Sequence, residues 1–147
     1  MKECTRSFEE LKVGEKAAVE KIVTEQDVNL FAEVSGDYNP VHVDEAFAQN
    51  TRFKKRIAHG MLAASLVSRV VGTKLPGPGT IYLSQTLNFK APVYFGDAIT
   101  AEVELIEKIP ARNFVKLKTL CFNQAGTVVL EGEALVLFGK QLSETPA

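Results

Sequence analysis

The spacing of hydrophobic residues divides the chain into a helical block and a run of strands. A first strand is predicted from about Lys16 to Val23, and Thr24, which is followed by acidic residues, resembles a helix N-cap. Apolar residues then recur at helical spacing, and Gly36 readily adopts the left-handed conformation that ends a helix. Asp37 is therefore expected to begin the loop beyond this helix.

The most apolar segment runs from Gly60 to Gly72, where small or apolar side chains occupy nearly every position until Arg69. This pattern predicts a helix that is buried on most sides. Ahead of it, Asp44 is expected to cap a short helix through Ala48, and the basic stretch Arg52 to Arg56 is expected to form a loop. The Gly60 to Gly72 helix is the segment most suited to the centre of the fold.

The second half of the chain changes to the two-residue alternation of half-buried strands. The strands follow a turn-rich break at residues 75–79, and Asn123 to Gly126 is a hairpin signal between the last two. One strand, a helical block and then strands with short connections favour an antiparallel sheet, which we expect to wrap around the central helix as an α+β fold. The predicted strands run from about Ile81 to Phe89, Ile99 to Leu105, Asn113 to Phe122 and Thr127 to Phe138.

Composition narrows the possible functions. The chain has 147 residues and a mass of 16.1 kDa, which fits a single domain over residues 1–147. The net charge of −1, with charges mixed along the sequence, gives no argument for a nucleic-acid or membrane partner. Cys4 and Cys121 lie far apart, and no signal segment or apolar run long enough to cross a bilayer is recognised, so we expect a reduced, cytoplasmic protein.

Asp37 and His42 stand five residues apart around Asn39-Pro40. The proline restrains the backbone and could direct an acid and an imidazole toward one point, as general acid–base catalysis requires. Gly, Asp, Asn and Pro are also the usual residues of turns, so an ordinary turn after a helix explains the same stretch. The residues alone leave both interpretations open.

A second candidate lies at the start of the central helix, in His59-Gly60. The free N–H groups and the dipole of a helix start can stabilise an oxyanion, and glycine allows a ligand to approach closely. Equally, Gly60 can serve tight helix packing, with His59 packing locally. For the stretch Arg52 to Arg56, a solvated loop is favoured over a site for substrate phosphates.

Other chemistries find little support in the sequence. Two histidines and two scattered cysteines show no paired spacing for a metal, and the glycines of residues 75–79 lack the context of a nucleotide-binding loop. Ser65 and Ser68 do not lie in a nucleophile elbow, and serines within helices commonly donate to a carbonyl one turn back. We therefore expect no metal site and no serine nucleophile.

Several motifs in register resemble the MaoC-like hydratases of the hot dog fold, and among them the single-domain (R)-specific enoyl-CoA hydratases. The likeness covers nearly the whole chain. It is carried by Gly36-Asp37-Tyr38-Asn39-Pro40-Val41-His42, Ile57-Ala58-His59-Gly60-Met61, Ser65-Leu66-Val67-Ser68, residues 75–83 and Val93-Tyr94-Phe95-Gly96-Asp97.

The resemblance implies a long helix wrapped by an antiparallel sheet and a homodimer with its active sites near the subunit interface. It implies that Asp37 and His42 activate a water that adds to a trans-2-enoyl-CoA, and that the N–H of Gly60 stabilises the thioester enolate. It places Asn39, His59 and Ser68 at the substrate. The implied partner is an acyl-CoA, and no cofactor beyond this substrate is expected.

Three alternatives remain open at this point. A hot dog thioesterase has a partly similar motif, but here Pro40 replaces its glycine, and Asp44 and Glu45 stand where its asparagines would be. The same fold could also serve a non-catalytic acyl-CoA binding protein, against which the presence of both Asp37 and His42 argues. A dehydratase acting on an acyl-carrier-protein substrate would have the same acyl chemistry. Chain-length preference and pathway, polyhydroxyalkanoate synthesis included, are not encoded in any recognisable motif.

Overall fold

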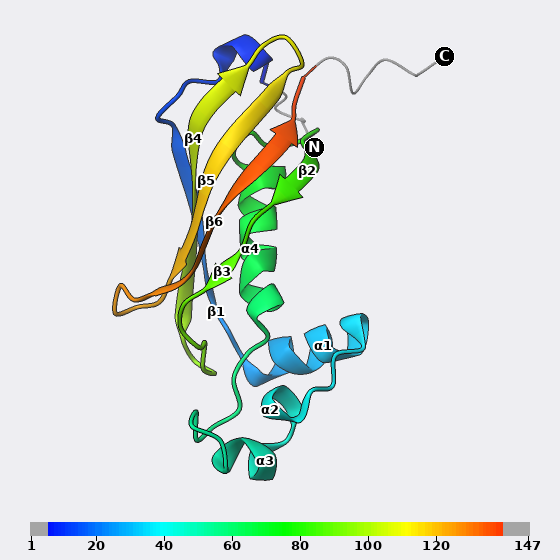
Figure 1. The fold of residues 1–147 in the computed structure, drawn as a ribbon, viewed down its shortest axis with the longest axis vertical. Helices are drawn as coiled ribbons and strands as arrows, with labels where there is room; N and C mark the ends of the chain where they lie inside the picture. The colour runs from blue at the N-terminus through cyan, green and yellow to red at the C-terminus, as the bar shows by residue number, and fades with distance from the viewer. Residues whose placement is uncertain (1–5, 140–147) are drawn as a thin grey trace.

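The computed structural model of the protein describes residues 6–139. Helices and strands occur in the order expected for an α+β chain, with the strands concentrated in the second half (Figure 1). The elements are the 3-10 helix η1 (Phe8–Glu10), β1 (Lys16–Ile22), α1 (Glu25–Ser35), α2 (Pro40–Val43), α3 (Glu45–Gln49), α4 (Gly60–Thr73), β2 (Ile81–Gln85), β3 (Asn88–Phe89), β4 (Ala98–Ile109), β5 (Phe114–Phe122) and β6 (Val128–Leu137).

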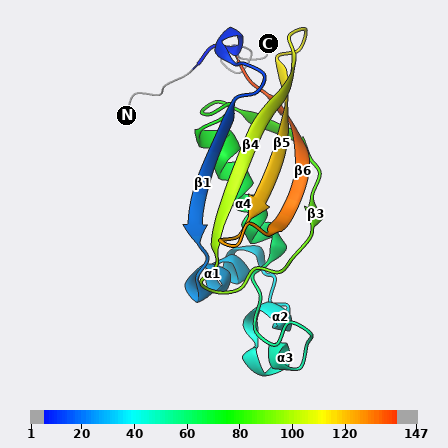
Figure 2. The same cartoon turned by 90° about the vertical axis from the view of Figure 1, so that its left-hand side faces the viewer.

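A single antiparallel sheet forms one layer of the molecule. Its strand order is β1-β4-β5-β6-β2, with β3 also paired to β6. Helix α4 lies lengthwise against one face of the curved sheet, and α1, α2 and α3 gather beyond one end of it (Figures 1 and 2). The predicted arrangement, an antiparallel sheet around a central helix, is confirmed.

The core lies between α4 and the sheet because alternate residues of each long strand point toward the helix. In β4, Ile99, Ala101, Val103 and Leu105 are all 0% exposed, as the period-two pattern predicted. Val67, Val70 and Val71 of α4 complete this core. Burial of this apolar surface is the main force that holds helix to sheet.

The strand predicted from Ile81 to Phe89 is divided into β2 and β3. The division occurs where Thr86 passes close over β6, and a Cβ on Gly132 would lie 1.8 Å from the carbonyl oxygen of Thr86. The expectation that this segment is half-buried holds for Leu87, which packs against the core, but it is wrong for Ile81, which is 48% exposed, and for Leu83, which is 45% exposed. The reason is that β2 stands at the edge of the sheet.

Helix α4 is buried on one side only, which corrects the prediction of burial on most sides. Its buried residues face the sheet, while Met61 is 54% exposed and Ser68 is exposed on the other side. Figure 1 shows that, among residues 6–139, the side of α4 turned away from the sheet is left open along most of its length. Helix α4 thus has more apolar residues than this chain buries by itself.

Local sequence signals account well for the helix ends. The side chain of Thr24 accepts the N–H of Asp27 and the Asp27 carboxylate accepts the N–H of Thr24, which is a capping box. Gly36 ends α1 with a φ of 76°, and Asp44 caps α3. The four-residue helix α2 was not predicted. No helix among residues 6–139 is long and apolar enough to cross a membrane.

Candidate active site

His42 lies on α2, which begins with Pro40 and is capped by Asn39, whose side-chain oxygen accepts the N–H of Val41. The Nδ1 of His42 is 2.8 Å from the carbonyl oxygen of Ile57. A carbonyl can only accept a hydrogen bond, so Nδ1 carries the proton and, in the neutral ring, Nε2 keeps its lone pair. Burial lowers the pKa of His42 below its usual value. The ring is therefore arranged as a neutral base at pH 7.

Asp37 is exposed in the loop directly after Gly36, and its carboxylate accepts the N–H of Asn39 at 3.1 Å. Side-chain oxygen or nitrogen atoms of Asp37, His42 and His59 all lie within 4.8 Å of one another. One water can bond two groups that are up to about 5.6 Å apart, twice an ordinary hydrogen-bond length. Asp37 and His42 are thus close enough to hold the same water.

His59 is packed between the two candidate catalytic residues. Its Nε2 donates to the backbone carbonyl of Asp37 at 2.9 Å, and its ring centroid is 4.0 Å from that of His42. The side chain is 2% exposed and Nδ1 has no hydrogen-bond partner among the residues described. His59 thus fixes the backbone of Asp37 and packs against the ring of His42, and its expected contact with substrate stays a prediction.

A pocket of about 390 Å³ brings His42 together with Gly60, the first residue of α4. The walls are mainly apolar and include Phe89 and Leu130. A Cβ on Gly60 would lie 2.6 Å from the ring of Phe89, so glycine is what allows this close approach. The N–H at the first position of a helix has no partner within the helix and lies at the positive end of the dipole. Gly60 can therefore donate to an oxyanion in the pocket.

Arg56 is a residue of this site whose role the sequence did not reveal. It is 8% exposed, whereas a solvated loop was expected; the preceding Arg52 and Lys54 are exposed as predicted. Its Nε donates to the carbonyl of His42 at 2.6 Å, and its other nitrogens donate to Glu25 and Asn29 of α1 at 2.9 and 2.7 Å. Arg56 thereby joins α2, which carries His42, to α1. No local sequence signal announces such a contact, because all its partners are distant in the chain.

Four of the predicted site residues do not line the pocket: Asp37, Asn39, His59 and Ser68. Asn39 caps α2, and Ser68 is exposed on the open side of α4. Ser65 behaves as predicted for a helix serine, since its Oγ donates to the carbonyl of Leu62 at 2.5 Å. Their roles toward a substrate remain predictions.

The two histidines stand apart in the sequence but lie together in the fold. Both are beside Asp37, and carboxylate and imidazole side chains are of the kind that can bind a metal ion. Of the cysteines, Cys121 is buried and unpaired, and Cys4 lies outside the described residues. That no metal takes part remains a prediction.

Residues 9–121 match the family described as MaoC like domain, and this span holds Asp37, His42, His59 and Gly60. The chain belongs to this family.

The MaoC-like chain is also similar to individual relatives. An (R)-specific enoyl-CoA hydratase of Rhodospirillum rubrum is 52% identical over 130 residues, which cover 88% of this chain and 90% of that protein. A mitochondrial 3-hydroxyacyl-[acyl-carrier-protein] dehydratase of Arabidopsis thaliana is 38% identical over 130 residues, which cover 86% and 77%. Among solved structures, the (R)-hydratase from Aeromonas caviae involved in PHA biosynthesis superimposes with a TM-score of 0.85 at 46% identity, covering 88% and 98%. This likeness confirms the hot dog fold.

Proposed function

We propose that the protein is an (R)-specific enoyl-CoA hydratase, a hydro-lyase that reversibly adds water to trans-2-enoyl-CoA to give (R)-3-hydroxyacyl-CoA. The observation that carries the proposal is that His42, whose side chain lies near that of Asp37, shares one pocket with Gly60 at the α4 N-terminus. Acid, base and oxyanion donor are the groups that this reaction needs. Relatives named as hydratases, about half identical to this chain, support the same activity.

The reaction follows from these positions. Asp37 and His42 hold the water, and Nε2 of His42 takes one of its protons as the oxygen bonds to the β-carbon. The electron pair of the double bond moves toward the thioester, whose oxygen becomes an enolate that the N–H of Gly60 stabilises. The proton then returns to the α-carbon, so the product gains one OH and one H and the enzyme is restored. No redox change occurs and no cofactor is needed.

A second candidate is dehydration of a 3-hydroxyacyl group on acyl-carrier protein. It is favoured by the identity with relatives named as acyl-carrier-protein dehydratases, and it uses the same residues in the reverse direction. Turnover of the same acyl group on coenzyme A and on acyl-carrier protein decides between the two carriers.

We also propose that the protein works as a homodimer. The exposed apolar residues Met61, Ile81 and Leu83 belong to the open side of α4 and to edge strand β2. Exposed apolar surface and an unpaired strand edge are typical of contact with another chain. A second copy would cover both.

The expectation of a cytoplasmic location is kept as part of the proposal and rests on the unpaired, buried Cys121.

One assay tests the activity. Purified protein should remove the conjugated enoyl-thioester absorbance of crotonyl-CoA without releasing free thiol, and chiral analysis should find the (R)-3-hydroxy product. Release of thiol would identify a thioesterase instead. Binding of crotonyl-CoA without either change would identify an acyl-CoA binding protein.

A further inference from the structure

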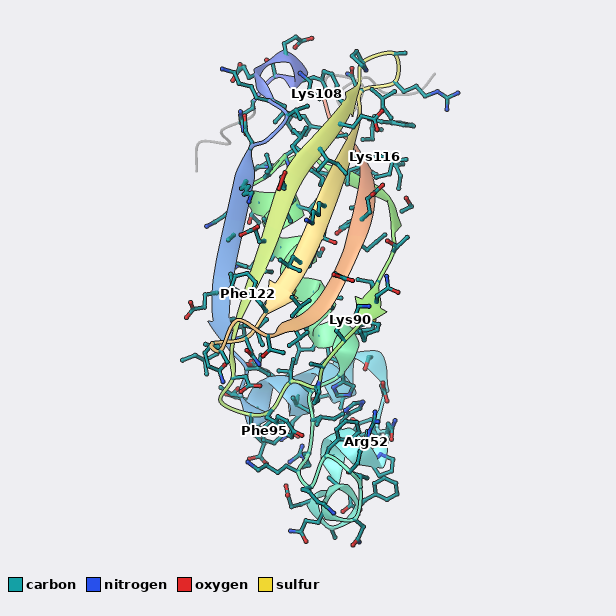
Figure 3. All side chains as sticks on the ribbon, turned by 60° about the vertical axis from the view of Figure 1, so that its left-hand side comes forward. Arg52, Lys90, Phe95, Lys108, Lys116 and Phe122 are labelled. Carbon is teal, nitrogen blue, oxygen red and sulfur yellow. The ribbon has the colours of Figure 1, made fainter. Side chains whose placement is uncertain are left out.

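Two exposed cations stand at the rim of the pocket that holds His42 and Gly60. Figure 3 labels Arg52, in the segment after α3, and Lys90, in the segment after β3. Both residues line this pocket. The inner wall differs from the rim because its residues, Ala63 and Leu130 among them, are buried and apolar. The pocket thus joins an apolar interior to a basic entrance.

Both cations are available to an anion. Arg52 makes no ion pair with any residue in the described range 6–139, and its guanidinium lies 4.8 Å from the ring centroid of Phe53, a stacking contact that orients it. Lys90 pairs with Glu131 at 3.4 Å, but both side chains are about half exposed. An exposed pair of this kind is weak, so a phosphate can replace the carboxylate.

We propose that Arg52 and Lys90 bind the phosphate of a phosphopantetheine arm that carries the acyl thioester. This inference rests on the proposed function, which places the thioester between His42 and Gly60. The acyl group then extends from one side of the thioester and the carrier arm from the other, toward the entrance. Coenzyme A and acyl-carrier protein share this arm and its phosphate. Guanidinium binds phosphate through two parallel hydrogen bonds, and the lysine adds a point charge.

The decisive comparison uses one acyl group with and without a phosphate. Arg52→Ala and Lys90→Ala are each expected to lower kcat/KM for crotonyl-CoA about 5-fold, mainly through KM, the effect of losing one exposed charge contact. With crotonyl-N-acetylcysteamine, which has the thioester but no phosphate, each variant should equal the wild type. Lys118→Ala is the matched control, because Lys118 is exposed on β5 between core-facing residues and does not line the pocket.

Different outcomes have distinct meanings. Equal losses on both substrates would overturn the proposal, because the cations would then be structural. Absence of a loss with crotonyl-CoA, or with crotonyl-phosphopantetheine, would also overturn it. A loss with crotonyl-phosphopantetheine supports it, and the ratio of turnover on crotonyl-CoA to that on crotonyl-acyl-carrier protein then identifies the source of the arm.

A binding measurement separates this proposal from the hydratase activity itself. By calorimetry, the Kd of coenzyme A should rise about 5-fold in Arg52→Ala, while that of pantetheine should not change. Raising the salt from about 0.05 to 0.5 M should weaken coenzyme A binding more in the wild type than in the double variant, because salt screens exposed charges. Phosphate-dependent binding without turnover would reject the hydratase activity and support the phosphate site. Turnover without phosphate-dependent binding would support the hydratase activity and reject the phosphate site.

Discussion

At the scale of single residues, the site depends on how three side chains, Asp37, His42 and His59, are held rather than on their being present. His42 is fixed on both sides: its ring donates to Ile57, and its carbonyl accepts from Arg56. Asp37 is fixed through its backbone by His59. These three hydrogen bonds hold the pair in place before substrate binds, which is the preorganisation that catalysis needs.

Removal of either candidate catalytic group should reduce turnover strongly. We expect Asp37→Asn and His42→Ala each to lower kcat on crotonyl-CoA by about 10²–10⁴, the usual contribution of a positioned proton-transfer group. Circular dichroism of both variants should match the wild type, because each variant loses a single side-chain hydrogen bond outside the core between α4 and the sheet. Wild-type turnover in a folded variant would remove that residue from the mechanism.

The pH dependence should reflect His42. Its pKa lies below the usual value of 6.5 because burial disfavours the charged ring. Protonation of Nε2 removes the lone pair that accepts the water proton, so kcat/KM should fall only as the pH drops below about 6.5. A pH–rate profile with crotonyl-CoA at constant ionic strength measures this limb. An acid limb centred above 6.5 would contradict the assignment.

Arg56 should stabilise the fold mainly through its contact with His42, not through its ion pair. The Glu25 side chain is 63% exposed, so that pair contributes little, whereas the 2.6 Å bond to the His42 carbonyl and the stacking on Phe95, 4.9 Å from ring centroid to guanidinium, are largely shielded from water. We expect Arg56→Ala to lower the free energy of unfolding by about 2 kcal/mol and Glu25→Ala by less than about 1 kcal/mol. Urea unfolding compares them, and equal losses would assign the effect to the ion pair.

At the scale of elements, the important feature is how closely neighbouring segments approach. The start of α4 meets the ring of Phe89, and β6 meets the segment between β2 and β3; in both places a Cβ would be too close. Gly60 and Gly132 therefore set the positions of a helix and of a strand break. Both positions need glycine because a Cβ would have no room there, and neither residue has a positive φ.

Replacing two glycines by alanine tests whether a Cβ is excluded at one position and tolerated at the other. Gly132→Ala would place a methyl group against the backbone of Thr86, which cannot move aside easily, so we expect a loss of at least about 2 kcal/mol in the free energy of unfolding. Gly72→Ala meets nothing within 4 Å on exposed α4 and should instead stabilise by about 0.5–1 kcal/mol. Thermal or urea unfolding gives both signs, and a neutral Gly132→Ala would mean that β6 can shift.

At the scale of the whole molecule, the chain leaves apolar surface that it cannot cover. The sheet shields one side of α4, while the opposite side and the β2 edge remain exposed (Figure 1). A second copy, placed against them, would remove this surface from water. The apolar residues of α4 would then be buried on most sides, as the sequence predicted.

The dimer prediction can be tested with one charge. We expect Leu83→Lys to shift the protein from dimer to monomer in size-exclusion chromatography with light scattering, because Leu83 lies on edge strand β2. Val13→Lys is the control: Val13 is 62% exposed but precedes β1 at the other edge of the sheet. A wild-type monomer, or a dimer insensitive to Leu83→Lys, would place any interface elsewhere.

The sequence by itself determined what is set by neighbours along the chain. Period-two alternation located β4 to β6, and Thr24 and Gly36 marked the ends of α1, because these signals act through local backbone geometry. The candidate site residues Asp37, His42 and Gly60 were selected by the resemblance of their motifs to a known family. Only the tertiary structure decided the rest. The burial of Arg56, the meeting of the two histidines, the division of β2 from β3 and the exposed side of α4 all depend on segments distant in the sequence, whose distances and burial no local pattern encodes.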